Sequence, residues 1–213
     1  MKLAAVAIAI CLAVPAIVGA QTDQRLVERV DSATLEEVVG ILRQAERIGL
    51  PTEPLIDKAL EGSSRRASRE MIVIAVRRLF DGMNTVRGVL GPDAGAAELN
   101  AGALALRAGA DVAAIEVLRR ARPDGDLTTP FGVLIDLVAI GVPAEDASII
   151  VSRLTGKGHT DSQLLELRSQ VVNDIRVGYP PVIAASVRSG VPTAAPPPVG
   201  AVVAEGLAGQ PQP

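Results

Sequence analysis

Three short segments of this chain share a Gly–apolar–Pro core, and their repetition strongly restricts the possible fold. They are Gly49-Leu50-Pro51, Gly141-Val142-Pro143 and Gly190-Val191-Pro192, and Gly109-Ala110-Asp111 is a version without proline. Glycine readily takes the left-handed conformation that ends a helix, and proline suits the start of the next helix. The apolar residue between them can pack beneath the turn. The pattern therefore predicts αα-hairpins, in which consecutive helices are neighbours.

The spacing of these turns leaves two architectures open. Gly49, Gly109 and Gly141 are separated by 60 and then 32 residues, which loosely fits a helix-pair unit of ~30–35 residues. Stacked hairpins form either a short solenoid-like stack or a closed, irregular bundle. The pattern could equally be a common way to end one helix and start the next, without descent from a repeat. The tetratricopeptide Trp and Tyr signature is missing.

Composition and periodicity both indicate an all-α fold. Hydrophobic residues make up 48% of the chain but aromatic residues only 1%. The core must therefore be aliphatic, which favours closely packed helices over a β-sandwich. Residues 71–76 are apolar on every face of a helix, which predicts a helix buried at the centre of the fold. A strand is the alternative, because Ile72-Val73-Ile74 is β-branched, but Arg77-Arg78 continues the helical pattern.

Capping patterns mark several of the expected helix starts. Thr34 followed by Glu37, and Thr160 followed by Gln163, each fit a capping box. Residues 129–130 are a Thr-Pro pair, for which we expect a threonine cap and a proline in the first turn.

These signals divide the chain into five parts. Residues 1–20 are a signal peptide, and residues 21–33 are a polar lead in which a first helix could begin. Residues 34–178 form the helical domain, and residues 179–193 hold one possible extra short helix. Residues 194–213 form a flexible tail rich in Pro, Gly and Ala.

The first twenty residues predict export. Lys2 supplies a positive start, residues 3–20 form an apolar run, and Val18-Gly19-Ala20 supplies small residues for cleavage near Ala20. An uncleaved membrane anchor is the alternative because of the length of the run, although Pro15 and the cleavage site favour removal. Apolar residues continue after Cys11, which disfavours lipidation. We expect a periplasmic or secreted protein that folds without disulfides.

Several segments carry a resemblance to a known group of proteins. They are Asp57–Gly62, Ile135–Val138, Gly141–Pro143 and Leu164–Ile175. Across residues 33–178 the chain resembles uncharacterised secreted all-helical proteins of high-GC bacteria. The resemblance implies an exported helical fold. It implies no activity and transfers no site residue.

Side chains suited to metal binding or nucleophilic catalysis are scarce. The chain has one histidine, His159, in a Gly-rich turn close to Asp161. One such ligand is too few for a zinc or iron site, and no Gly-x-Ser-x-Gly elbow accompanies it. Gly156-Lys157-Gly158 lacks the spacing of a phosphate-binding P-loop. We therefore expect no metal and no cofactor, and we interpret His159 as a surface loop residue.

Two carboxylate pairs have a structural explanation. Glu36-Glu37 and Glu145-Asp146 are expected in first helical turns, where negative charge favours the helix dipole. An enzyme that uses only carboxylates stays possible from the sequence. A sugar cleft is disfavoured, because the chain has no Trp and one Tyr to line it.

The most suggestive functional feature is a run of arginines. It comprises Arg65, Arg66, Arg69, Arg77, Arg78 and Arg87. Arginine suits phosphate and carboxylate groups, so this face could bind an anionic lipid or polymer or an acidic protein surface. The alternative is a solvated face of ordinary helices. A net charge of −3 and the lack of stacking aromatics exclude nucleic acid as the expected partner.

The sequence therefore predicts an exported, non-enzymatic helical module that binds or scaffolds a protein partner in the bacterial envelope. Two alternatives remain: an envelope enzyme that uses carboxylates only, and a peripheral module that binds anionic lipid or polymer through the arginines. The sequence leaves the oligomeric state open.

Overall fold

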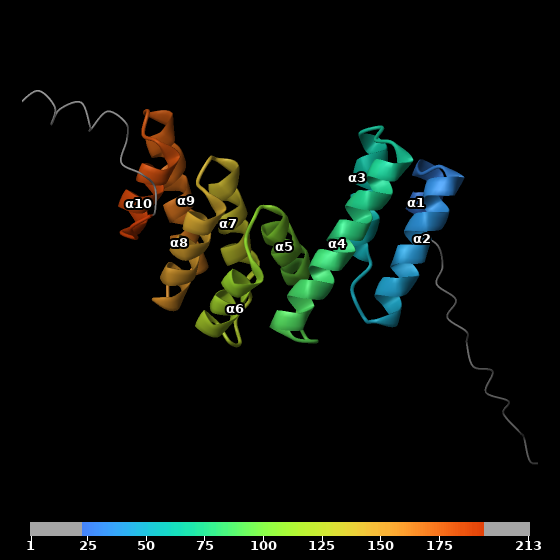
Figure 1. Cartoon of the computed structure of the whole chain (residues 1–213), viewed down its shortest axis with the longest axis horizontal. Coiled ribbons are helices and arrows are strands. Elements are labelled where there is room, and N and C mark those ends of the chain that lie inside the picture. Colours follow the sequence, from blue (N-terminus) through green and yellow to red (C-terminus); the bar gives the residue numbers. More distant parts are fainter. Residues whose placement is uncertain (1–22, 194–213) are drawn as a thin grey trace, which may run out of the picture.

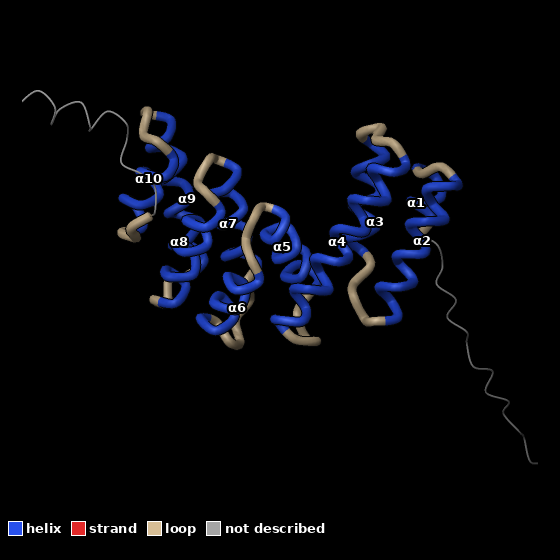
Figure 2. Tube along the Cα trace, viewed as in Figure 1, coloured by secondary structure: helices blue, strands red, loops and turns tan. Residues whose placement is uncertain are grey.

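The structure, a computed structural model, describes residues 23–193, and this part of the chain contains ten helices and no strand (Figure 2). The helices are α1 Gln24–Arg29, α2 Ser32–Arg47, α3 Glu53–Ser64, α4 Arg69–Leu90, α5 Ala96–Arg107, α6 Val112–Ala121, α7 Thr128–Ala139, α8 Ala144–Gly156, α9 Asp161–Arg176 and α10 Pro181–Ser189. The prediction of an all-α fold is confirmed, and Ile72-Val73-Ile74 lies within α4 rather than in a strand. The expected signal peptide and tail lie outside the described residues.

The helices are stacked in two rows along the molecule (Figure 1). The even-numbered helices form one row and the odd-numbered helices the other, and the substantial helix–helix contacts join helices one or two places apart in the chain. Helices α1 and α10 lie at opposite ends of the array (Figure 1). The arrangement is therefore an open, solenoid-like stack, not a closed bundle.

The Gly–apolar turns have the expected geometry. Gly49 and Gly141 have φ angles of +71° and +102°. In each turn the next residue, Leu50 or Val142, donates its N–H to the carbonyl oxygen five residues earlier, at 2.9 and 3.0 Å respectively. Leu50 and Val142 are buried beneath their turns. These hydrogen bonds satisfy the last carbonyls of one helix while the chain reverses into the next.

Helix α2 begins earlier than the sequence suggests, so the interpretation of Thr34 as its cap is wrong. The N-cap is Asp31, whose Oδ1 accepts the N–H groups of Ala33 and Thr34 at 3.1 and 3.0 Å. The buried Thr34 hydroxyl donates to Asp31 Oδ2 at 2.6 Å. An ionised carboxylate is a stronger acceptor than a hydroxyl, which explains why the aspartate takes the capping position.

The sequence allowed a first helix to begin in the lead of residues 21–33, before the expected start of the helical domain at residue 34. Helix α1 lies within residues 21–33, with Asp23 as its cap. Leu26 and Val30 are buried in the core, and their burial fixes this segment against the rest of the stack. At the other end, α10 lies within residues 179–193.

Two further capping predictions have opposite outcomes. The capping box of Thr160 and Gln163 is present at the start of α9. Thr129 is not a cap, because α7 already begins at Thr128, and Pro130 lies in its first turn as expected. The carboxylate of Asp126 instead accepts the N–H of Thr128 at 2.6 Å.

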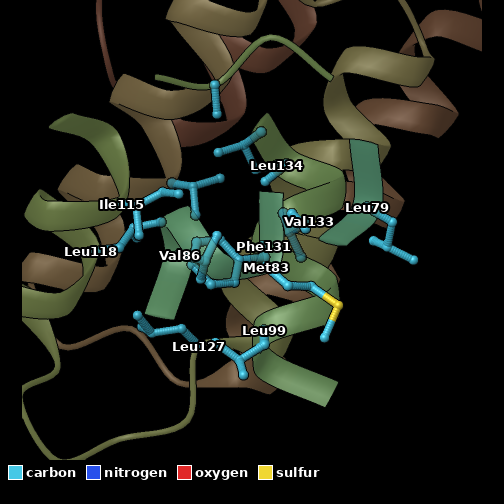
Figure 3. Close-up of a cluster of buried hydrophobic side chains, with 14 of the residues drawn as sticks. Leu79, Met83, Val86, Leu99, Ile115, Leu118, Leu127, Phe131, Val133 and Leu134 are labelled. Carbon is cyan, nitrogen blue, oxygen red and sulfur yellow. The ribbon is translucent and has the colours of Figure 1, made fainter. Parts of the chain in front are cut away.

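Several of the largest buried side chains gather where α4, α5, α6 and α7 meet (Figure 3). Phe131 is fully buried there among aliphatic side chains. A Cβ on Gly102 would lie 2.7 Å from Val86 and 3.2 Å from Phe131, so α5 requires a glycine to approach its neighbours this closely. The core is aliphatic apart from its few aromatic residues, as composition predicts.

Helix α4 is central, because it contacts α2, α3, α5 and α6. The prediction that residues 71–76 are buried on every face is nevertheless wrong. Met71 is 61% exposed and Ile74 is 45% exposed. Across residues 23–193, no helix is both long enough and apolar enough to cross a membrane.

Candidate functional site

The six arginines of the predicted anion-binding face do not form one cluster. Three of them, Arg69, Arg77 and Arg87, extend from α4 to α2. Their partners on or beside α2 are, in order, Glu37 Oε1 at 2.8 Å, Gln44 Oε1 at 2.7 Å and the carbonyl oxygen of Ile48. The partners follow the same order along both helices, so α2 and α4 run parallel. These side chains hold two neighbours of the even row together.

The other three arginines have separate surroundings. Arg65 pairs with Glu61 on its own helix at 2.9 Å, and Arg66 ends α3 with a left-handed backbone. Arg78 lines a cleft on the other side of α4. Anion binding by the six residues together stays a prediction. The six side chains do not converge on one place where an anion could bind them all.

His159 lies in the turn between α8 and α9. Its ring nitrogen Nδ1 is 3.0 Å from the carbonyl oxygen of Leu154, which favours the tautomer that carries the proton on Nδ1. A polar cavity of about 350 Å³ beside the ring is also lined by Ser162 and Glu166. In the part of the chain that the structure describes, no group of three or more His, Cys, Asp or Glu side chains could hold a metal ion.

The two carboxylate pairs have different positions. Glu145 and Asp146 lie in the first turn of α8, as expected. Glu36 and Glu37 lie in the second turn of α2, because that helix starts at Ser32. Glu37 pairs with an arginine of α4.

The odd row is weakest between α3 and α5, and a cleft opens there. Helices α3 and α5 make few contacts with each other, although both pack firmly on α4. Two cavities of about 450 and 400 Å³ lie between them, and they share Lys58, Leu79 and Leu104 as lining residues. We call this connected space the α3–α5 cleft. Its walls are α3 and α5, and its floor is α4.

The floor of the α3–α5 cleft is apolar and accessible. Met71 and Ile74, the exposed large hydrophobic residues of α4, both line it. Leu104 and Leu106 contribute from α5 and are only partly buried. A run of exposed aliphatic side chains along a concave surface is typical of interaction sites in soluble proteins.

Charged groups border the cleft unevenly. Lys58 Nζ lies 2.5 Å from Glu61 Oε2, and this hydrogen bond is the main reason why the pKa of Glu61 falls below its ordinary value. Arg65 and Arg107 lower that pKa further through their positive charge. Arg78 and Arg107 flank the apolar floor from α4 and α5.

A separate cavity lies between α6 and α8. Its volume is about 650 Å³, and it is lined mostly by small or short side chains such as Ala113, Ala114, Ser148 and Ser152. Helices α6 and α8 pack directly against each other, so this hollow overlies a complete helix–helix contact. The α3–α5 cleft instead lies where one row of the stack is interrupted, which makes it the stronger candidate site.

A partly buried ion pair fixes the connection between α6 and α7. Arg119 Nη2 donates to Glu98 Oε1 at 2.7 Å, and the same oxygen accepts the N–H of Leu127 at 3.0 Å. Arg119 Nη1 lies 3.0 Å from each of three carbonyl oxygens of the connection, those of Arg122, Pro123 and Gly125. These contacts are structural, and the capping and periodicity patterns give no sign of them.

Comparison of the chain with protein-family models, curated proteins and solved structures finds no match. The resemblance to secreted helical proteins therefore stays a prediction. Sequence reasoning missed Met71, Ile74 and Arg107 as site residues. The sequence did contain an indication of Met71 and Ile74. Residues 71–76 are apolar on every face of the helix, and neighbouring helices do not cover all of that apolar surface.

Proposed function

We propose that this protein is an exported, non-enzymatic binding module that holds a protein partner of the bacterial envelope in the α3–α5 cleft. The observation that carries the proposal is the exposure of Met71 and Ile74 on the floor of that cleft. Leaving large aliphatic side chains in water gives up the free energy of burying them, about 1.5–3 kcal/mol for each fully buried residue. A partner that covers them recovers this free energy.

The open stack supports the same proposal. Stacked helices expose long surfaces, and repeat proteins of this type commonly use such surfaces to bind other proteins. The interruption between α3 and α5 gives the surface a defined recess. Export is supported by the apolar run and the small-residue cleavage site at the start of the chain.

Site-specific photocrosslinking tests this function. A benzophenone amino acid at Ile74 places the reactive group on the cleft floor, and the same amino acid at Val187 is the matched control. Val187 is an aliphatic residue of α10 that is 69% exposed, and it lies outside the cleft. In envelope extract we expect a discrete crosslinked species from position 74 and not from position 187.

The variant Ile74→Asp complements the crosslinking. It places a charge on the cleft floor, and because Ile74 is largely exposed the fold should tolerate it. Capture of the same species by the tagged protein should fall with Ile74→Asp and persist with Val187→Asp. Equal labelling from both positions, or capture that is indifferent to Ile74→Asp, would remove the cleft as the binding site.

A further inference from the structure

The charges around the α3–α5 cleft specify the kind of partner that fits it. At one end, the acidic groups Glu53 and Asp57 are already matched, because Arg25 lies 2.8 and 3.8 Å from their carboxylates. At the other end, Arg78 has no ion pair in the part of the chain that the structure describes, and it is exposed. The cleft therefore has a cationic end without a matching anion of its own.

Arg107 strengthens that cationic end. It lies in the last turn of α5, and its charge acts on Glu61, which already has Lys58 and Arg65 as closer cationic partners. The cavity that contains Met71 and Ile74 is lined by three cations, Lys58, Arg78 and Arg107, and by no carboxylate. The local excess of positive charge borders the aliphatic floor on which Ile74 lies.

The shape of the cleft favours a helix as the occupant. Its walls, α3 and α5, run in the same direction, because the chain reverses between α3 and α4 and again between α4 and α5 (Figure 1). Gly82 and Ala103 pack against each other where α4 meets α5, and the small residue Ala75 lies beside Ile74 on the floor, where it leaves room for a partner side chain. A groove between two helices with an aliphatic floor accepts the apolar face of an amphipathic helix, through side chains spaced three and four residues apart.

We propose that the occupant of the α3–α5 cleft is an amphipathic helix of a partner protein, with Asp or Glu residues bordering its apolar face. The apolar face covers Met71 and Ile74, and the carboxylates pair with Arg78 and Arg107. This inference rests on the proposed binding function and adds the chemistry of the partner segment. Complementary charge of this kind sets register and partner choice more than total affinity.

Selection from a displayed peptide library tests the inference. The library holds amphipathic helices of about 16 residues, whose positions beside the apolar face vary among Glu, Gln and Lys. The immobilised wild-type protein should enrich Glu at these positions. The charge-reversed variant Arg78→Glu/Arg107→Glu should enrich Lys instead and bind the wild-type-selected peptide about tenfold more weakly.

A matched control separates local from overall charge. Arg43 and Arg176 are exposed arginines outside the cleft, and Arg43→Glu/Arg176→Glu changes the net charge by the same amount. This control should keep the preference for Glu and the wild-type affinity. If it weakens binding as much as the cleft variant does, overall charge causes the effect and the inference is wrong.

Other outcomes also decide the question. Selection of neutral or basic helices, or of none, overturns the inference. Binding to vesicles of phosphatidylglycerol that is lost in Arg78→Glu/Arg107→Glu, without peptide binding, assigns the cleft to a lipid surface instead. Crosslinking from position 74 stays independent of these results: if it captures a protein while acidic helices are not selected, the partner chemistry fails but the binding function stands.

Discussion

Arg66 shows how strongly the fold dictates backbone conformation at a single residue. In residues 23–193 it is the one non-glycine residue with a positive φ, at +55°. It ends α3 with the same hydrogen-bond pattern as the glycine turns: Ala67 N–H donates to Gly62 O at 3.0 Å, and Arg66 N–H donates to Ser63 O at 2.9 Å. A side chain with a Cβ is strained in this conformation, so the position favours glycine.

We therefore predict that Arg66→Gly stabilises the protein by about 1 kcal/mol. The neighbouring variant Arg65→Gly is the control, because Arg65 has an ordinary φ of −84° and pairs with Glu61. That control should be neutral or destabilising. Urea denaturation followed by circular dichroism measures both free energies of unfolding. Loss of stability in Arg66→Gly would show that the arginine side chain makes a compensating contact.

At the scale of one helix, the start of α2 depends on the ionised Asp31 carboxylate. The hydrogen bond from the Thr34 hydroxyl is the main reason why the pKa of Asp31 lies below its ordinary value, and the N–H groups of Thr34 and Ala33 lower it further. The carboxylate is thus bound more favourably in the folded state than in the unfolded state. Its stabilising effect is present above the unfolded pKa of about 3.9 and is lost as the pH falls through the lower folded value.

This linkage predicts that the difference in stability between Asp31→Ala and wild type depends on pH. Asp31→Ala should be less stable than wild type at pH 7, because the cap acceptor is gone. The difference should shrink as the pH is lowered below about 4, where the wild-type carboxylate also becomes protonated. Asp31→Asn retains an acceptor and should lose less at pH 7. Thermal melts from pH 7 to pH 3 measure this, and a difference that does not change with pH would contradict it.

Helices α5, α6 and α7 are joined through the Glu98–Arg119 pair. Removing Glu98 with Glu98→Ala should destabilise the protein by about 1–3 kcal/mol, because it leaves the partly buried Arg119 guanidinium without its carboxylate. Glu98→Ala/Arg119→Met removes both charges. Its loss of unfolding free energy should be smaller than the sum of the losses in Glu98→Ala and Arg119→Met. Glu116→Ala breaks an exposed pair with Arg120 and should cost about 0.5 kcal/mol or less. Denaturant unfolding of wild type, Glu98→Ala, Arg119→Met, the double variant and the Glu116→Ala control measures the coupling.

At the scale of the whole molecule, the open stack makes stability local. Contacts join helices that are near in the chain, so the two ends are linked only through the helices between them. In such an array an end can open while the rest stays folded. The cluster around Phe131 lies in the middle and holds the two halves together (Figure 3).

Hydrogen exchange distinguishes these regions. Val171→Ala removes buried side-chain volume from α9, and it should speed exchange in α9 and α10 while α2, α3 and α4 stay protected. Phe131→Ala should cost about 3–5 kcal/mol and speed exchange throughout the stack. Equal acceleration in all helices of Val171→Ala would show that the molecule unfolds as one cooperative unit.

The sequence alone was sufficient for features whose causes are local. Glycine's access to the left-handed backbone and the helical spacing of aliphatic residues correctly predicted the turns at Gly49 and Gly141 and an all-α fold. The same local reasoning failed at Thr34, where the competing acceptor Asp31 took the cap.

Features that depend on how distant segments meet were decided by the tertiary structure. The sequence grouped six arginines, but packing of α4 between α2 and α5 sent Arg69, Arg77 and Arg87 toward α2 and Arg78 into the cleft. Periodicity shows which residues of a helix are apolar, yet only the positions of neighbouring helices determine which of them are covered. The exposed cleft floor therefore follows from the sparse contact between α3 and α5, which no segment of the chain encodes by itself.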